Sequence, residues 1–182
     1  MARRSIGPAD LADLEARLAH ELPRFGLRYK DESRLQRLIG AAVRPFNARY
    51  LTDYTTVMFG RVWFPSRAWC ERQGAAGVYR ILRHEAVHLR DARRWPGVFQ
   101  FSYVFLLPAG LSARAWWEWR AYAETVRVEA EIDGRVSDAT LAHIARAFTG
   151  PDYLFMFPFP RLVRRRLEAL RGRVLAELGI HP

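Results

Sequence analysis

The chain has 182 residues and a formal net charge of +10; half of its residues are hydrophobic and 26% are charged. This is the composition of a globular protein of one-domain size, and it excludes a disordered chain, a collagen or a coiled coil as a description of the whole. The single cysteine, Cys70, excludes an internal disulfide framework and a cysteine-rich zinc module, so any metal site must use His, Asp and Glu.

The positive charge is almost entirely arginine, because Lys30 is the only lysine. Such a charge admits a nucleic-acid or acidic-membrane partner, but the arginines are scattered along the chain and do not favour one. No apolar run of a secretory signal follows the basic amino terminus. The longest apolar stretch, near residues 98–107, is roughly half as long as a membrane-spanning helix. We therefore expect a cytoplasmic protein without a transmembrane segment.

The first half of the chain alternates predicted helices and strands. Leucines at helical spacing predict a helix over residues 8–20, and the short alternating segment at residues 25–30 predicts a strand. Asp31 and Ser33 can both cap a helix that continues to about Val43. On that helix we expect the apolar side chains to face inward, namely those of Leu35, Leu38 and Ile39.

Residues 55–64 are rich in β-branched and aromatic side chains, and they predict one strand interrupted at Gly60 or a hairpin that turns at Gly60 and Arg61. A strong helical pattern follows over residues 75–95 and ends at Pro96. Further helices are predicted over residues 112–132, with Ser112 as the N-cap, and over residues 137–148 and 162–178. Because the strands are gathered toward the front of the chain, the order of elements indicates an α+β domain.

His84, Glu85 and His88 form the sequence HExxH in the middle of the 75–95 helix. A spacing of four places both imidazoles on one helix face, one turn apart, as a zinc site requires. At about 100° per residue, the histidines and Glu85 fall on an apolar flank of the helix. Buried His and Glu side chains need a compensating charge, which a metal ion supplies. The pattern therefore predicts one Zn²⁺ per chain. The opposite side of this helix carries Arg80, Arg83, Arg90 and Arg94.

A strand, then a helix with HExxH, then a later helix resembles the zincin metallopeptidases over about residues 25–132. The resemblance implies a small mixed or antiparallel sheet packed on the HExxH helix. It also implies that residues 55–64 supply an edge strand that holds extended peptide substrate. The mostly helical part over about residues 135–182 would extend this core within a single domain, residues 1–182.

The third ligand distinguishes the branches of this family. Metzincins place it six residues after the second histidine, with a glycine between, where this chain has Arg94 and Asp91; that branch is excluded. Gluzincins take a glutamate from a following helix, often with an alanine three residues later, and Glu118 matches this pattern. The resemblance therefore implies His84, His88 and Glu118 as the zinc ligands.

Other carboxylates are alternatives at this position. Glu124 is the main one, and Glu129 is another, although the acidic residues after it indicate a solvated helix end. Asp91 is a candidate acceptor for an imidazole N–H. The chain departs from the family at Tyr122, where related enzymes often carry an aspartate that orients a ligand histidine.

The resemblance implies hydrolysis of peptide bonds by a zinc-activated water. Glu85 would take the proton of that water and pass it to the leaving amine. Tyr122, one turn after Glu118, is the candidate second electrophile that stabilises the oxyanion; the alternative is a tyrosine packed in the core. The aromatic segments at residues 99–107 and 151–160 either line an apolar substrate groove or belong to the core.

We therefore expect a zinc-dependent peptidase whose partner is a peptide or protein substrate. The alternative is a non-catalytic protein that uses the zincin scaffold for binding or regulation, in association with nucleic acid. A third hypothesis keeps the peptidase but places it on DNA, like the repair metalloproteases that cleave DNA-bound proteins. The intact Glu85 favours catalysis, because a purely structural zinc site does not need this residue.

Overall fold

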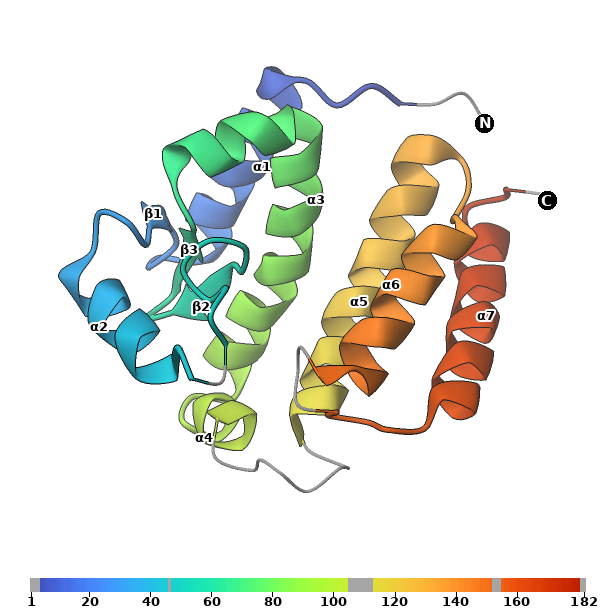
Figure 1. Cartoon of the computed structure of the whole chain (residues 1–182). Coiled ribbons are helices and arrows are strands. Elements are labelled where there is room, and N and C mark those ends of the chain that lie inside the picture. Colours follow the sequence, from blue (N-terminus) through green and yellow to red (C-terminus); the bar gives the residue numbers. More distant parts are fainter. Residues whose placement is uncertain (1–3, 46, 105–112, 152–154, 181–182) are drawn as a thin grey trace. The chain divides into compact units, whose positions relative to one another are not determined.

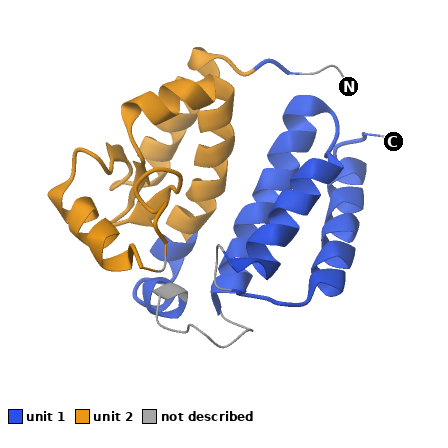
Figure 2. Cartoon of the chain, in the orientation of Figure 1, with its two compact units in different colours: residues 1–5, 91–182 blue, residues 6–90 orange. Residues whose placement is uncertain are grey.

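The computed structural model describes residues 4–45, 47–104, 113–151 and 155–180, which form two compact units (Figure 2). Unit 2 comprises residues 6–90, and unit 1 comprises residues 1–5 and 91–182. The boundary falls inside the helix that carries HExxH, between Arg90 and Asp91. The core expected over residues 25–132 is thus divided between the two units, and the single-domain assignment stays a prediction.

Unit 2 contains a small sheet and the helices around it (Figure 1). Of the two predicted caps of its second helix, Asp31 and Ser33, the N-cap is Ser33, whose hydroxyl oxygen accepts a hydrogen bond from the Gln36 N–H at 3.3 Å. The elements are α1 (Pro8–Glu21), β1 (Leu27–Tyr29), α2 (Arg34–Val43), β2 (Thr56–Met58), β3 (Arg61–Phe64) and α3 (Arg67–Arg94), whose last turn lies in unit 1.

The three strands form a mixed sheet in the order β1-β3-β2, which agrees with the predicted α+β class. β1 is parallel to β3, and β2 is antiparallel to β3. Residues 55–64 form a hairpin rather than one strand, but its turn lies at Phe59 and Gly60 and not at the predicted Gly60 and Arg61, because Arg61 already pairs with Met58. Phe59 and Gly60 both have positive φ, 55° and 77°, as a type I′ turn requires. Only the first half of this segment, β2, is therefore an edge strand.

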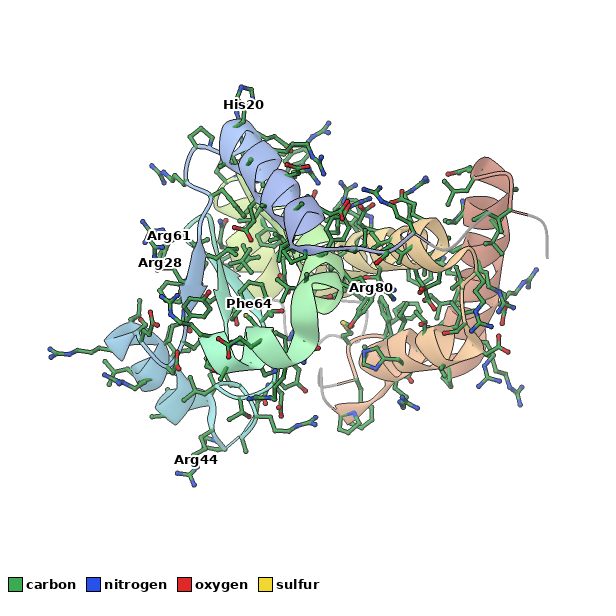
Figure 3. The ribbon with its side chains drawn as sticks, turned by 90° about the horizontal axis from the view of Figure 1, so that it is seen from above. His20, Arg28, Arg44, Arg61, Phe64 and Arg80 are labelled. Atoms are coloured by element: carbon green, nitrogen blue, oxygen red, sulfur yellow. The ribbon has the colours of Figure 1, made fainter. Side chains whose placement is uncertain are left out.

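The two faces of the sheet are covered differently. Val62 and Phe64 are fully buried on one face, whereas Arg61 is exposed on the other. Figure 3 shows Arg28 and Arg61 pointing away from the sheet and Phe64 beside α3. Helix α2 contacts the face of Met58, whose Sδ lies 3.8 Å from Nε2 of Gln36. The sheet therefore has α2 on one side and α3 on the other.

The inward face of α2 is not the one that its apolar residues predict. Leu35 and Leu38 are 46% and 69% exposed, so their predicted burial is wrong, and Ile39 is only half-buried. Gln36 and Gly40 are buried instead. Gln36 faces inward because its amide has polar partners there, and Gly40 because an added Cβ would lie 2.6 Å from Cγ of Leu51.

Helix α3 consists of two helical segments joined at Gly74, which has non-helical angles of φ 65° and ψ 172°. The second segment matches the predicted helix over residues 75–95 and ends just before Pro96, as expected. The position of HExxH in the middle of this segment is therefore confirmed.

Unit 1 is helical in its described part. Figure 1 shows α5, α6 and α7 side by side. Their apolar core includes Val126, Ile144, Phe148, Leu167 and Val174. The helices match the predicted ones except for α4, which forms from the aromatic segment; Ser112, a predicted N-cap, lies outside the described residues. Unit 1 contains α4 (Val98–Val104), α5 (Ala113–Asp133), α6 (Asp138–Thr149) and α7 (Pro160–Glu177).

A helix needs about 20 mostly apolar residues to cross a bilayer. Across residues 4–45, 47–104, 113–151 and 155–180, none combines enough length with enough apolar character to cross a membrane.

Candidate metal and catalytic site

The two histidines of HExxH lie one turn apart on α3, in unit 2. The ring centroids of His84 and His88 are 5.2 Å apart, with the planes at 76° to each other. His88 is 4% exposed and His84 is half-buried. Two imidazoles on one face of one helix form a pair of nitrogen donors that a transition metal can share.

Glu85 lies on the buried flank of α3, as predicted, with 6% of its surface exposed. Its Oε1 accepts a hydrogen bond from the hydroxyl of Thr55, the residue just before β2. The carboxylate beside the histidines is therefore buried and held by a hydroxyl donor.

The arginine side of the helix agrees in part with the prediction. Arg90 and Arg94 are exposed, but Arg80 and Arg83 are half-buried.

Lys30 is completely buried in unit 2. Its Nζ donates to the backbone carbonyls of Tyr50 and Tyr54, at 2.8 Å and 2.9 Å, and lies 3.7 Å from the centroid of the Tyr50 ring. Burial lowers the pKa of Lys30 to about 7, and the charge of Glu85 acts in the opposite direction. Sequence reasoning missed Lys30 and Thr55; the one signal was that a chain with 29 Lys and Arg residues has a single lysine.

Glu118, the predicted third ligand, lies on α5 in unit 1 and is 2% exposed. Near it, Arg120 forms two hydrogen-bonded contacts with Asp91, from Nε to Oδ2 at 3.0 Å and from Nη2 to Oδ1 at 2.9 Å. Asp91 is 2% exposed. The carboxylate proposed as an acceptor for an imidazole is thus the partner of Arg120, and it fixes α5 to the last turn of α3.

The remaining candidates also lie on α5. Tyr122 is 8% exposed and belongs to the apolar core, with its ring centroid 5.6 Å from that of Phe148. This placement favours packing over oxyanion stabilisation. Glu124 is half-buried. Glu129 is buried rather than solvated, contrary to expectation, because its Oε1 accepts from the N–H of Ser137 at 3.1 Å in the connection to α6.

No protein-family model matches the chain, and neither the curated proteins nor the solved structures gave a match. The chemistry of the site follows from its side chains. Unit 2 presents a pair of imidazoles and next to them a buried carboxylate that can accept a proton. The charge of this carboxylate also raises the pKa of the buried Lys30.

Proposed function

We propose that this protein is a zinc-dependent peptidase of the zincin type, in its gluzincin branch. The observation that carries the proposal is the environment of HExxH. The motif lies within a continuous helical segment, with His88 and Glu85 both buried and Glu85 held by Thr55. A chance match on a solvated helix would have no need to bury these groups or to give the carboxylate a donor.

The proposed ligands are His84 and His88 from α3 and Glu118 from α5. Two imidazoles and one carboxylate are a donor set that can hold Zn²⁺. The burial of Glu118 supports this assignment, because a buried carboxylate needs a compensating charge. Glu124, which is half-buried, is the alternative third ligand.

In this proposal Glu85 is the general base. When bound, Zn²⁺ would polarise the scissile carbonyl and lower the pKa of a water to near 7. Glu85 takes the proton of the attacking water and then transfers it to the leaving amine nitrogen. Because Oε1 accepts from Thr55, the oxygen that carries the proton is Oε2.

The proposed substrate is an extended peptide that pairs with β2. This strand lies at the edge of the sheet, and an edge strand offers backbone N–H and C=O groups to a peptide. Thr55 immediately precedes β2 and bonds to Glu85, so the strand begins next to the proposed base. A peptide along β2 would therefore run past the carboxylate that has to act on it.

The decisive measurement is the metal content of untagged, purified protein by elemental mass spectrometry. We expect close to one zinc per chain, lost in His88→Ala and retained in His143→Ala. The latter is the matched control because His143 is exposed on α6. If the wild-type protein holds no zinc after zinc addition and dialysis, the proposal is wrong.

Hydrolysis is then measured with a library of internally quenched fluorogenic peptides on the zinc-loaded protein. Cleavage that His88→Ala abolishes supports the peptidase. A chain that holds zinc but cleaves no peptide in the library would favour the alternative, a non-catalytic protein on the zincin scaffold. The affinity for DNA, measured at increasing salt concentrations, would show whether nucleic acid is its partner, because phosphate contacts make the affinity fall steeply with salt.

A further inference from the structure

Unit 2 contains a chain of polar contacts that begins at Lys30 and ends at Glu85. The lysine is anchored at the end of β1, where its backbone N–H donates to the carbonyl of Phe64 at 2.8 Å. Its side chain is completely buried, although an exposed lysine is the far commoner state. A buried ammonium group is retained only where several partners compensate for its lost hydration.

The first partners of Lys30 are in the segment at residues 50–54. Its Nζ donates to the carbonyls of Tyr50 and Tyr54 and lies over the ring of Tyr50. The carbonyl of Tyr54 belongs to the peptide bond that joins Tyr54 to Thr55. Lys30 therefore fixes the orientation of the peptide group directly before Thr55.

The position of the Tyr50 ring is itself fixed. Its hydroxyl donates to Oε1 of Gln36 at 2.7 Å, and the amide nitrogen of Gln36 contacts Sδ of Met58. Gln36 is completely buried on α2. These contacts join α2, the segment at residues 50–54 and β2, so the clamp around Lys30 is supported on more than one side.

The last step of the chain is the bond from Thr55 to Glu85. The hydroxyl donates to Oε1. This bond fixes the rotation of the carboxylate, so that Oε2 is the oxygen left for proton transfer. The charge of Glu85 also raises the pKa of Lys30, against the effect of burial. Lys30 is thus linked to this carboxylate through the backbone of Tyr54 and Thr55 and through its charge.

We propose that Lys30 and Thr55 are positioning residues for Glu85: Lys30 orients the Tyr54–Thr55 peptide, and the Thr55 hydroxyl holds Oε1 so that Oε2 is presented for proton transfer. The role of Glu85 as a base rests on the proposed peptidase function. The arrangement of the three side chains does not, and it can be tested without substrate or metal.

The first test uses the fact that Lys30 is the only lysine. Labelling with ¹³C- and ¹⁵N-lysine gives one side-chain signal, which is titrated by NMR in metal-free protein. We expect a midpoint near 7 in the wild-type protein. In Glu85→Gln the midpoint should fall, because the opposite charge that favours the ammonium form is removed. An ordinary midpoint near 10.5, or no change in Glu85→Gln, would overturn the proposal.

The second test compares three variants of the zinc-loaded enzyme on one cleaved peptide. Thr55→Val removes the hydroxyl at nearly constant volume and should lower kcat about tenfold with KM and zinc content unchanged. Thr55→Ser keeps the hydroxyl and should restore most of the activity. Thr52→Val is the control in the same segment, since the Thr52 side chain is exposed and bonds only locally, to the Arg49 carbonyl.

The two tests fail in different ways. If Thr55→Val retains the wild-type kcat, the positioning role is wrong although the peptidase stands. If no peptide is cleaved, the peptidase function fails, and the Lys30 titration still decides whether Lys30 and Glu85 interact. A purely structural role for Lys30 would leave its midpoint unaffected by Glu85→Gln.

Discussion

The two units of the chain bury different kinds of side chain. The core of unit 1 between α5, α6 and α7 is apolar. Two of its buried acids, Asp91 and Glu129, hold helices through Arg120 and Ser137. Glu118, which is also buried there, is the proposed zinc ligand. Unit 2 has an apolar layer too, but it also buries polar and charged side chains from several elements. They are Lys30, Gln36, Glu85 and His88.

This difference indicates where stability and function reside. Apolar burial stabilises a fold by about 25 cal/mol per Å², whereas a buried polar group contributes little even when it is fully paired. A network such as that of unit 2 is therefore a poor source of stability. We infer that it is retained for what it holds in place, the carboxylate of Glu85. Each of the following variants separates these two contributions.

Replacing the carboxylate should have the largest effect on function and little on the fold. Glu85→Gln keeps the size and the acceptor oxygen for Thr55, but removes the proposed general base. We expect kcat to fall by about 10²–10⁴-fold, with the zinc content and the urea midpoint close to wild type. Full activity of this variant on a cleaved peptide would contradict the role of Glu85.

Replacing an apolar residue of unit 1 should have the reverse effect. Ile144 is completely buried in the helical core, so Ile144→Ala leaves a cavity and should lower the free energy of unfolding by about 2–5 kcal/mol. The measurement is urea unfolding followed by circular dichroism. The NMR signal of Lys30, in unit 2, should keep its position and its titration midpoint. A shifted Lys30 signal would contradict this comparison, because the loss of an apolar side chain in unit 1 would then also disturb the polar contacts of unit 2.

The charge of Lys30 predicts how stability depends on pH. Its pKa is about 7 in the folded chain and 10.5 in the unfolded one, so between these values the unfolded state binds more protons. The free energy of unfolding should therefore rise with pH, by up to about 2 kcal/mol from pH 7 to pH 9. Above pH 9 the raised pKa of Cys70, about 11, acts in the opposite direction.

Lys30→Met removes this titration. The wild-type and variant free energies of unfolding, measured in urea at intervals between these two pH values, should diverge as the pH rises, because only the wild-type protein gains stability. Every other titrating group is common to both proteins, so the difference between the curves isolates Lys30. Parallel curves would mean that Lys30 keeps an ordinary pKa in the folded chain.

The motif helix and its buried flank could be predicted because the information is local. Helical spacing, a proline stop and the period of 3.6 residues fix where His84, Glu85 and His88 lie on α3. The segment at residues 55–64 was predicted as a strand or a hairpin. The turn of the hairpin includes Phe59 at positive φ. Phenylalanine rarely adopts positive φ, so no local rule predicts a turn at this position.

The supports of Glu85 could not be predicted because they come from distant parts of the chain. Thr55 is 30 residues before Glu85, and Lys30 is 24 residues before Tyr54. Both residues lie in predicted strand segments, but no motif links either of them to Glu85, and their contacts exist only once the sheet has brought β1, β2 and α3 together. Glu118 was predicted as the third ligand from a family resemblance. Tyr122 was predicted as the second electrophile, but it lies in the apolar core because its helix packs against α6.

Helix α2 gives the smallest and most selective comparison, since its apolar and polar positions are reversed relative to expectation. Leu38 is 69% exposed, so Leu38→Gln should change the free energy of unfolding by less than about 0.5 kcal/mol. Gln36 is completely buried, and Gln36→Leu removes the acceptor of the Tyr50 hydroxyl; it should cost about 1–3 kcal/mol although it makes the site more apolar. Urea unfolding of the two variants measures both changes. If Leu38→Gln were the more harmful one, α2 would pack through its leucines, and the clamp on Lys30 would lose its support from Gln36.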